Sequence, residues 1–373
     1  MKNLRRPFVA AFTVLLFSCS EPPPPLAASK AEENVLHLYN WSDYVDPDVL
    51  SAFTAETGIN VVYDTFDSSE TLETRLLVGN TGYDIVVPGA PFLGRQIKAG
   101  VFQPLDKSKL DNWRHLDAEI LQLLETYDVG NTYAIPYLWG TTGLGFNVKR
   151  VRAILGDDVE LNSFDLIFKP ENIEKLQKCG VAFIDAPGEV EAAALHYVGK
   201  KAGSLIEADY AAAEALLSAV RPFVRYFHSA QYVNDLANGD ICVALGWNGD
   251  ILQAGRRAVE ANNGEQIEYY LPREGTEIWI DTMAIPKDAP HKDNAHKFIN
   301  FILRPEMIAK ISNFVAYPNA NFTSYKLITP ELMTNPNIFP NAEMRSKLYV
   351  VPILPDNIDR VITRQWTKIK TGQ

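Results

Sequence analysis

Three tryptophans in this sequence are each followed within three residues by an aspartate. The pairs are Trp41 with Asp43, Trp247 with Asp250, and Trp279 with Asp281. An indole ring attracts a cation through its quadrupole, and a nearby carboxylate favours the same charge. Together these residue types favour the binding of an organic cation. Packing in a core is the alternative for a single tryptophan, and it is our interpretation of Trp113, Trp139 and Trp366.

Each of the three pairs lies beside the end of a predicted strand or at a predicted crossing. Apolar runs predict strands at residues 35–39, 241–245 and 277–285. Open α/β sheets bind ligands at the ends of their strands, so the pairs stand where a ligand site is expected.

Helices alternate with strands along the chain, which predicts a mostly parallel sheet. Asp46 and Pro47 predict the start of a helix, and Gly58 predicts its end. Residues 133–147 are extended and rich in glycine, and we place the first crossing between two lobes there. Residues 269–271 and 277–285 are predicted to pair with each other around Arg273-Glu274-Gly275, and the second of these strands carries the return crossing.

The composition is that of a globular protein with two cores. The chain has 373 residues, of which 47% are apolar and 22% charged. Its net charge of -11 opposes binding to nucleic acid or to an anionic membrane and suits a cationic ligand, although solubility alone also explains it. No His or Cys cluster has metal-ligand spacing, so we expect no metal and no cofactor.

Sequence motifs of catalysis are missing from the chain. There is no Gly-x-Ser-x-Gly elbow and no phosphate-binding loop, and the six histidines form no nucleophile and base pattern. We therefore expect no catalytic residue.

The N-terminus has the features of an export signal. Basic residues precede an apolar run at residues 7–17, which is too short to span a bilayer. We predict a signal peptide at residues 1–18. The run ends in Leu16-Phe17-Ser18-Cys19, which resembles a lipobox and predicts lipidation of Cys19, with ordinary signal-peptidase cleavage as the alternative. Residues 19–34 contain a proline run and are predicted to be a tether.

Two further cysteines, Cys179 and Cys242, remain in the exported part of the chain. An even number in an oxidising compartment favours a disulfide, and two buried thiols are the alternative.

From the first strand almost to the end, the sequence resembles the bacterial periplasmic polyamine-binding proteins of ABC transporters, most closely the putrescine-type branch. The resemblance covers roughly residues 35–370 and is carried by a colinear set of segments. They are Asn40-Trp41-Ser42-Asp43-Tyr44, Thr57-Gly58-Ile59, Tyr83-Asp84-Ile85-Val86-Val87-Pro88, Val101-Phe102-Gln103-Pro104-Leu105-Asp106-Lys107-Ser108-Lys109-Leu110, Lys169-Pro170-Glu171-Asn172, Asp185-Ala186-Pro187, Asn234-Asp235-Leu236-Ala237-Asn238-Gly239-Asp240-Ile241-Cys242-Val243-Ala244 and Gly246-Trp247.

This resemblance implies an α/β protein with the type II periplasmic binding fold, in which two α/β lobes are joined by two crossings around a ligand cleft. The crossings fall near Thr141 and Asp281. Lobe 1 would comprise residues 35–141 plus 282–325, and lobe 2 residues 142–281 plus 326–373. The family also places a disulfide at the positions of Cys179 and Cys242.

The resemblance further implies a site made of an aromatic box, carboxylates and small polar positions. The ligand-binding positions are Trp41, Ser42, Asp43, Tyr44, Gly89, Glu189, Trp247, Asp250, Trp279, Asp281 and Tyr317. Gly89 departs from the serine that putrescine binders commonly have, and Trp279 is similar to the spermidine-preferring members. Without the resemblance, Glu189 would be interpreted as stabilising a helix N-terminus.

We therefore expect a periplasmic substrate-binding protein, not an enzyme, that captures a linear polyamine and delivers it to an inner-membrane ABC permease. Spermidine is expected to be preferred over putrescine. The protein is predicted to be a monomer that contacts a membrane only through a lipid on Cys19. The alternatives are a polyamine-dependent sensor with the same fold and a secreted α/β hydrolase with an acidic pair.

Overall fold

The computed structural model describes residues 32–372, which belong to one compact unit. The predicted signal peptide, Cys19 and all but the last residues of the predicted tether lie outside the described residues. Among residues 32–372, no helix is long and apolar enough to cross a membrane.

The first half of the sheet follows the predicted order of strands and helices. Strand β1 (Val35–Trp41) pairs in parallel with β2 (Asn60–Phe66) and with β3 (Ile85–Val86). Helix α1 (Pro47–Thr57) connects β1 to β2, and Asp46 caps it by accepting a hydrogen bond from the Asp48 backbone N–H. Gly58, with φ of 73°, ends this helix in the left-handed conformation that glycine adopts without strain.

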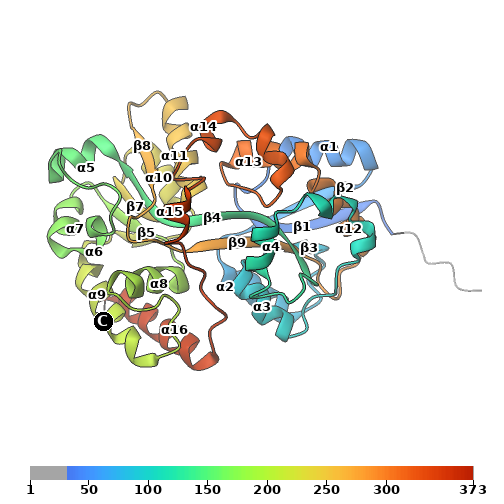
Figure 1. The fold of residues 1–373 in the computed structure, drawn as a ribbon, viewed down its shortest axis with the longest axis horizontal. Helices are drawn as coiled ribbons and strands as arrows, with labels where there is room; N and C mark the ends of the chain where they lie inside the picture. The colour runs from blue at the N-terminus through green and yellow to red at the C-terminus, as the bar shows by residue number, and fades with distance from the viewer. Residues whose placement is uncertain (1–31, 373) are drawn as a thin grey trace, which may run out of the picture. The chain divides into compact units, whose positions relative to one another are not determined.

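Two strands run through the middle of the sheet, whose order is β2-β1-β3-β9-β4-β7-β5-β6, where β5 is Val181–Phe183 and β6 is Tyr226–Phe227. They are β4 (Ala134–Asn147) and β9 (Ile278–Ala284), which lie side by side in Figure 1. Strand β4 pairs with β9 as far as Thr141, and from Thr142 it pairs with β7 (Val243–Trp247). This change of partner falls where the sequence places the first crossing, while the lobe boundaries themselves stay a prediction.

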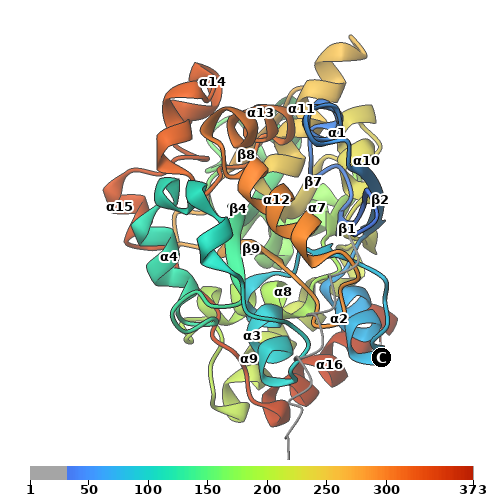
Figure 2. The ribbon, with the colours of Figure 1, turned by 90° about the vertical axis from the view of Figure 1, so that its right-hand side faces the viewer.

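Two large, separate apolar clusters lie on either side of this change of partner. The helices that bury residues in the first cluster are α1, α2 (Ser69–Val78), α3 (Ala90–Lys98), α4 (Ala118–Leu124), α12 (Lys292–Ile302) and α13 (Pro305–Val315). Figure 2 shows α12 next to β1. The composition therefore correctly predicted two cores rather than one.

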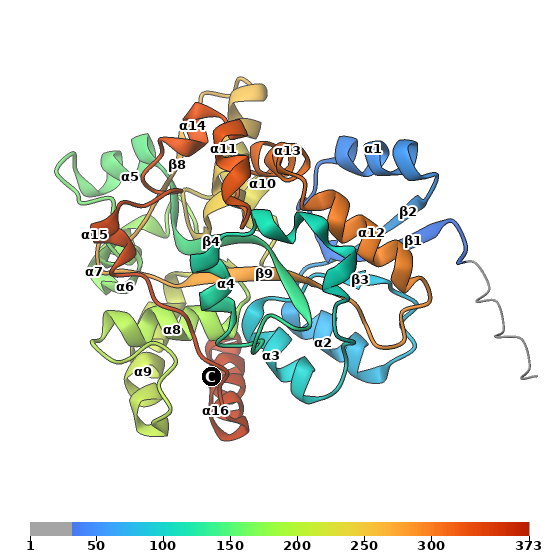
Figure 3. The same cartoon turned by 45° about the vertical axis from the view of Figure 1, so that its right-hand side comes forward.

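The second cluster surrounds β5 (Val181–Phe183), β6 (Tyr226–Phe227) and β7. Its helices are α5 (Val148–Leu155), α6 (Asp165–Phe168), α7 (Pro170–Leu176), α8 (Pro187–Tyr197), α9 (Tyr210–Val220), α10 (Gln231–Asn238), α11 (Asn248–Glu260) and α16 (Asp356–Thr371). The short helices α14 (Pro330–Met333) and α15 (Ala342–Arg345) precede α16 in the chain. Figure 3 shows α16 beside α9, so the end of the chain completes this second core.

The prediction of a mostly parallel sheet is wrong. The parallel pairs are β1 with β2, β1 with β3, β5 with β6 and β5 with β7. An equal number of pairs is antiparallel, and each of them includes β4 or β9. The two central strands β4 and β9 thus supply the antiparallel part, which an alternation of strands and helices along the sequence does not reveal.

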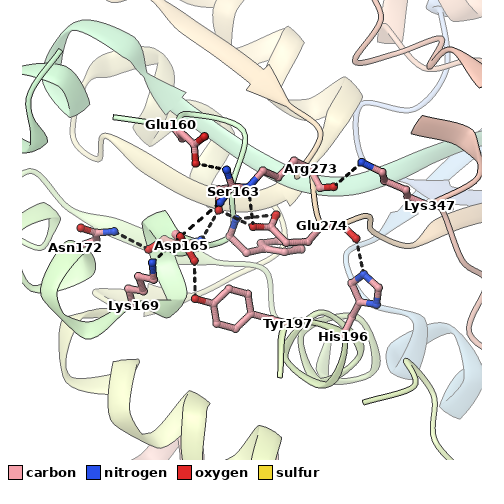
Figure 4. Close-up of polar contacts among 11 residues, drawn as sticks. Glu160, Ser163, Asp165, Lys169, Asn172, His196, Tyr197, Arg273, Glu274 and Lys347 are labelled. Atoms are coloured by element: carbon pink, nitrogen blue, oxygen red, sulfur yellow. Dashed lines mark hydrogen bonds and ion pairs between the residues drawn. The ribbon is translucent and has the colours of Figure 1, made fainter. Parts of the chain in front are cut away.

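The predicted pairing of residues 269–271 with residues 277–285 is also wrong, because β8 (Ile267–Tyr270) pairs with β4. The loop between β8 and β9 is bound to other elements instead, as Figure 4 shows. The Ser163 hydroxyl donates to Glu274 Oε1 at 2.5 Å, and the Lys347 ammonium donates to the Arg273 carbonyl at 3.2 Å. His196 Nε2 lies 2.7 Å from the Glu274 carbonyl oxygen. Because of these contacts, the loop does not form a tight hairpin turn between β8 and β9.

Cys179 and Cys242 form a disulfide, which confirms the predicted pair. Cys179 follows α7, and Cys242 precedes β7. The bond therefore joins a helix end to the start of a central strand within the second core.

Candidate functional site

All of the predicted ligand-binding positions line one cavity of about 480 Å³. They come from distant parts of the chain: β1 and the turn after it, the start of α3, the first turn of α8, the β7–α11 junction, β9, and the segment after α13. The structure brings the three Trp and Asp pairs together, as the resemblance implies. By contrast, Trp139 and Trp366 are buried in the two cores, as expected, and Trp113 packs against the first core.

Aromatic rings form the walls of this cavity. The ring of Tyr317 lies 5.2 Å from that of Tyr44 and 5.5 Å from that of Trp279, in edge-to-face geometry. Trp41 and Trp247 form a second pair with ring centroids 5.9 Å apart. The cavity thus presents ring faces and edges suited to a cation and to a methylene chain.

Two glycines allow these rings to lie against the backbone. A Cβ atom at Gly140 would lie 2.4 Å from the Trp279 ring, and one at Gly249 would lie 2.4 Å from the Tyr317 ring. A side chain at either position would displace its ring, so these glycines position the walls.

Asp281 lies on β9 and is only 8% exposed. The Tyr44 hydroxyl donates to its Oδ2 at 2.8 Å. Burial raises the pKa of this carboxyl to about 7, and the charge of Glu189 adds to the shift. The carboxylate is therefore desolvated and held in place before any ligand arrives.

Asp250 occupies the first turn of α11. It accepts hydrogen bonds from the hydroxyls of Tyr317, at 2.6 Å, and Tyr232, at 2.9 Å. Burial raises its pKa to about 6, Asp43 adds to this shift, and the two tyrosines and Arg257 oppose it. Two tyrosines thus fix the direction of this carboxylate.

Glu189 lies in the first turn of α8, where Ala186 gives the helix no side-chain cap. Its Oε2 accepts hydrogen bonds from the Trp247 indole N–H, at 2.9 Å, and from the Thr142 hydroxyl. Burial raises its pKa to about 7. These contacts reach across to β4 and β7, so the side chain belongs to the cavity wall.

The three remaining predicted positions, Asp43, Ser42 and Gly89, also line the cavity but contribute no buried carboxylate without a cationic partner. Asp43 is 66% exposed and pairs with Arg257 at 2.9 Å, so much of its charge is already compensated. Ser42 is exposed. A Cβ atom at Gly89 would lie 3.4 Å from Asp281 Oδ1, so a small side chain could begin at this position without displacing the carboxylate.

Glu277 is the main cavity residue that the sequence analysis missed. It is 5% exposed, lines the cavity, and its Oε2 has no hydrogen-bond partner among the described residues. Burial raises its pKa well above the usual range, and the charge of Glu189 adds to this shift. Glu277 lies directly before β9 and alternates with Trp279 and Asp281 of that strand, so the period of two in strands could have identified it.

Among the described residues, no group of three or more His, Cys, Asp or Glu side chains is arranged to hold a metal ion. The cavity does contain a basic residue, Arg95. It donates to both carboxylate oxygens of Glu73 and pairs with Asp359 at 3.1 Å. This guanidinium therefore has two acidic partners of its own.

Comparison with known proteins identifies the type of molecule to which this cavity belongs. Residues 40–309 match the family described as bacterial extracellular solute-binding protein. The chain belongs to this family. The sequence is 53% identical over 344 residues to the putrescine-binding periplasmic protein PotF of Escherichia coli K12, covering 92% of this chain and 93% of that protein. It is 51% identical over 346 residues to the putrescine-binding periplasmic protein SpuD of Pseudomonas aeruginosa, covering 93% and 94%.

The fold is similar to that of a solved spermidine/putrescine ABC transporter substrate-binding protein, PotD of Streptococcus pneumoniae. The TM-score is 0.74 at 27% identity, with 91% of this chain and 99% of that chain covered. The predicted fold class, with two α/β lobes around a ligand cleft, is thereby confirmed. The prediction of a solute-binding protein rather than an enzyme is also confirmed, since its family and these relatives are named as binding proteins.

Proposed function

We propose that the protein captures a linear polyamine in the periplasm and delivers it to an ABC importer. One observation carries this proposal: buried carboxylates converge on an aromatic-walled cavity without basic partners. Among the described residues, Glu189, Glu277 and Asp281 form no ion pair, and Arg95 of the same cavity is already paired. A buried carboxylate without a cation is costly, so such a site favours a positively charged occupant.

The aromatic walls specify the rest of the ligand. A linear amine carries ammonium groups separated by methylenes, and rings such as Trp279 and Tyr317 can cover the methylenes between carboxylates. An amino acid would require a free arginine for its carboxylate, and Arg95 is not free. The names of PotF and SpuD support the same ligand class.

Transport requires that the ligand-bound form differ from the free form. We propose that the lobes, residues 35–141 plus 282–325 and residues 142–281 plus 326–373, close on the ligand and present a surface to an inner-membrane permease. The ligand drives closure only through its greater affinity for the closed state. We also propose that the protein is a monomer and that it carries a lipid on Cys19.

Calorimetric titration tests the function. Residues 27–373, stripped of bound ligand by unfolding and refolding, should bind one equivalent of spermidine, putrescine or cadaverine. A folded protein that produces no heat with any of the three amines would refute the proposal.

The preference for spermidine depends on Trp279, whose wide ring can cover a longer amine. Relatives with more than half of their residues identical are named for putrescine, and their names do not support this preference. Trp279→Phe is expected to lower the ratio of spermidine to putrescine affinity, because the smaller ring covers fewer methylenes. Parallel titrations measure this ratio, and an unchanged ratio would exclude Trp279 as its source.

A further inference from the structure

The carboxylate of Glu277 has no assigned role, although it is almost completely buried in the cavity. Its Oε2 has no hydrogen-bond partner among the described residues, and no described basic side chain forms an ion pair with it. Burying such a group without a partner costs free energy, so a cation bound beside this carboxylate in the cavity would be stabilised.

Glu277 shares one face of an extended segment with two other cavity residues. Glu277, Trp279 and Asp281 line the cavity, whereas Ile278 and Ile280 do not. This alternation is that of a strand, and β9 begins directly after Glu277. The indole of Trp279 therefore stands midway between two carboxylates on the same face.

The spacing of these carboxylates corresponds to a particular ligand length. Four residues of a strand span about 13 Å at about 3.3 Å each. The terminal nitrogens of extended spermidine are roughly 11 Å apart and those of putrescine roughly 6 Å, for zigzag chains with bonds of about 1.5 Å. With a charge-assisted hydrogen bond of about 2.8 Å at each end, spermidine spans roughly 17 Å and putrescine roughly 12 Å, so the longer amine covers the span between these two positions more readily.

The groups around Glu277 favour a cation at its end of the cavity. Glu189 of α8 is close enough for its charge to raise the pKa of Glu277. The Thr142 backbone N–H of β4 donates to the Glu277 carbonyl at 3.4 Å, and Tyr349 pairs with Glu277 in a parallel bridge. Tyr349 and Tyr127 are the other titratable groups that respond to its charge, and both are neutral phenols at pH 7. None of these groups is positively charged, so the ammonium of a ligand would supply the positive charge beside Glu277.

We propose that Glu277, together with Glu189, forms an end site for the distal ammonium of an amine as long as spermidine, while Asp281 holds the other end and Trp279 covers the methylenes between them. This inference rests on the proposed polyamine-binding function and adds a length-determining residue to it. Putrescine bound at Asp281 would not contact Glu277.

The test uses 1,8-diaminooctane, which has the length of spermidine without its central amine. Wild-type protein and Glu277→Gln are titrated with spermidine, 1,8-diaminooctane and putrescine. The variant is expected to lose about 10- to 100-fold in affinity for both long amines, the effect of removing one buried charge-assisted hydrogen bond. Its affinity for putrescine should stay unchanged.

Glu191→Gln is the matched control, because Glu191 is a buried carboxyl on α8 that does not line the cavity and whose oxygens also have no partner among the described residues. It should leave all three affinities unchanged. Thermal unfolding checks that each variant folds, and Glu277→Met, an apolar side chain of similar length, provides a second variant.

Equal losses for long and short amines, or none, would overturn the end site while leaving the proposed function intact. Wild-type protein that binds none of the three amines would overturn both.

Discussion

Replacing Asp281 by asparagine is expected to lower polyamine affinity by about 100- to 1,000-fold, the effect of leaving a buried ammonium without its charge partner. The Tyr44 hydroxyl can still donate to the amide oxygen, so the geometry of the wall is retained. Ligand-free protein should become at least as stable as the wild type, because burial already raises the pKa of this carboxyl to about 7. Titration calorimetry measures the first effect, and thermal unfolding without ligand measures the second.

Asp185→Asn is the control for this prediction. Asp185 lines the same cavity, but its carboxylate accepts from the Trp366 indole N–H at 2.8 Å and pairs with Lys370. Its charge is therefore compensated within the protein, and its loss should leave ligand affinity unchanged. If Asp281→Asn bound polyamine as tightly as the wild type, the ligand would not contact this carboxylate.

Local sequence signals predicted most elements around the site. Asp46, Pro47 and Gly58 correctly predicted α1, and the apolar run at 35–39 lies within β1. These signals succeed because capping and apolar periodicity act within a few residues. The cavity residues themselves were predicted through colinear resemblance rather than through any short motif.

Contacts between distant segments were beyond these signals. Strand β8 pairs with β4 because β4, a strand of 14 residues, continues past its change of partner as far as Asn147, and nothing in residues 269–285 encodes this choice. The ion pair between Asp43 and Arg257 joins the turn after β1 to α11, more than 200 positions apart, and it removes much of the free charge expected of Asp43. Glu277 is different, since its alternation with Trp279 and Asp281 was visible in the sequence.

The burial of the cavity carboxylates predicts opposite effects of pH on ligand binding and on the stability of the ligand-free protein. The pKa values of Glu189 and Asp281 are raised to about 7, and that of Asp250 to about 6, from 4.5 and 3.8 for ordinary Glu and Asp. The ammonium groups of a polyamine, with pKa values near 10, stay charged throughout this range. Affinity should therefore rise as the pH increases from about 5.5 to 8, because the carboxylates must lose their protons to bind the amine.

The stability of the ligand-free protein should change in the other direction. Since these carboxyls hold protons more tightly when folded, the resulting stabilisation is complete below the pKa of the unfolded chain and is lost as the pH rises from about 4 to 7. Titrations at several pH values, in two buffers with different enthalpies of ionisation, measure the affinity and the number of protons released. Asp281→Asn should release about one proton fewer than the wild type near pH 6. If affinity were constant from pH 5.5 to 8 and no protons were released, the ligand would not neutralise these carboxylates, and the cavity would have to bind its cation elsewhere.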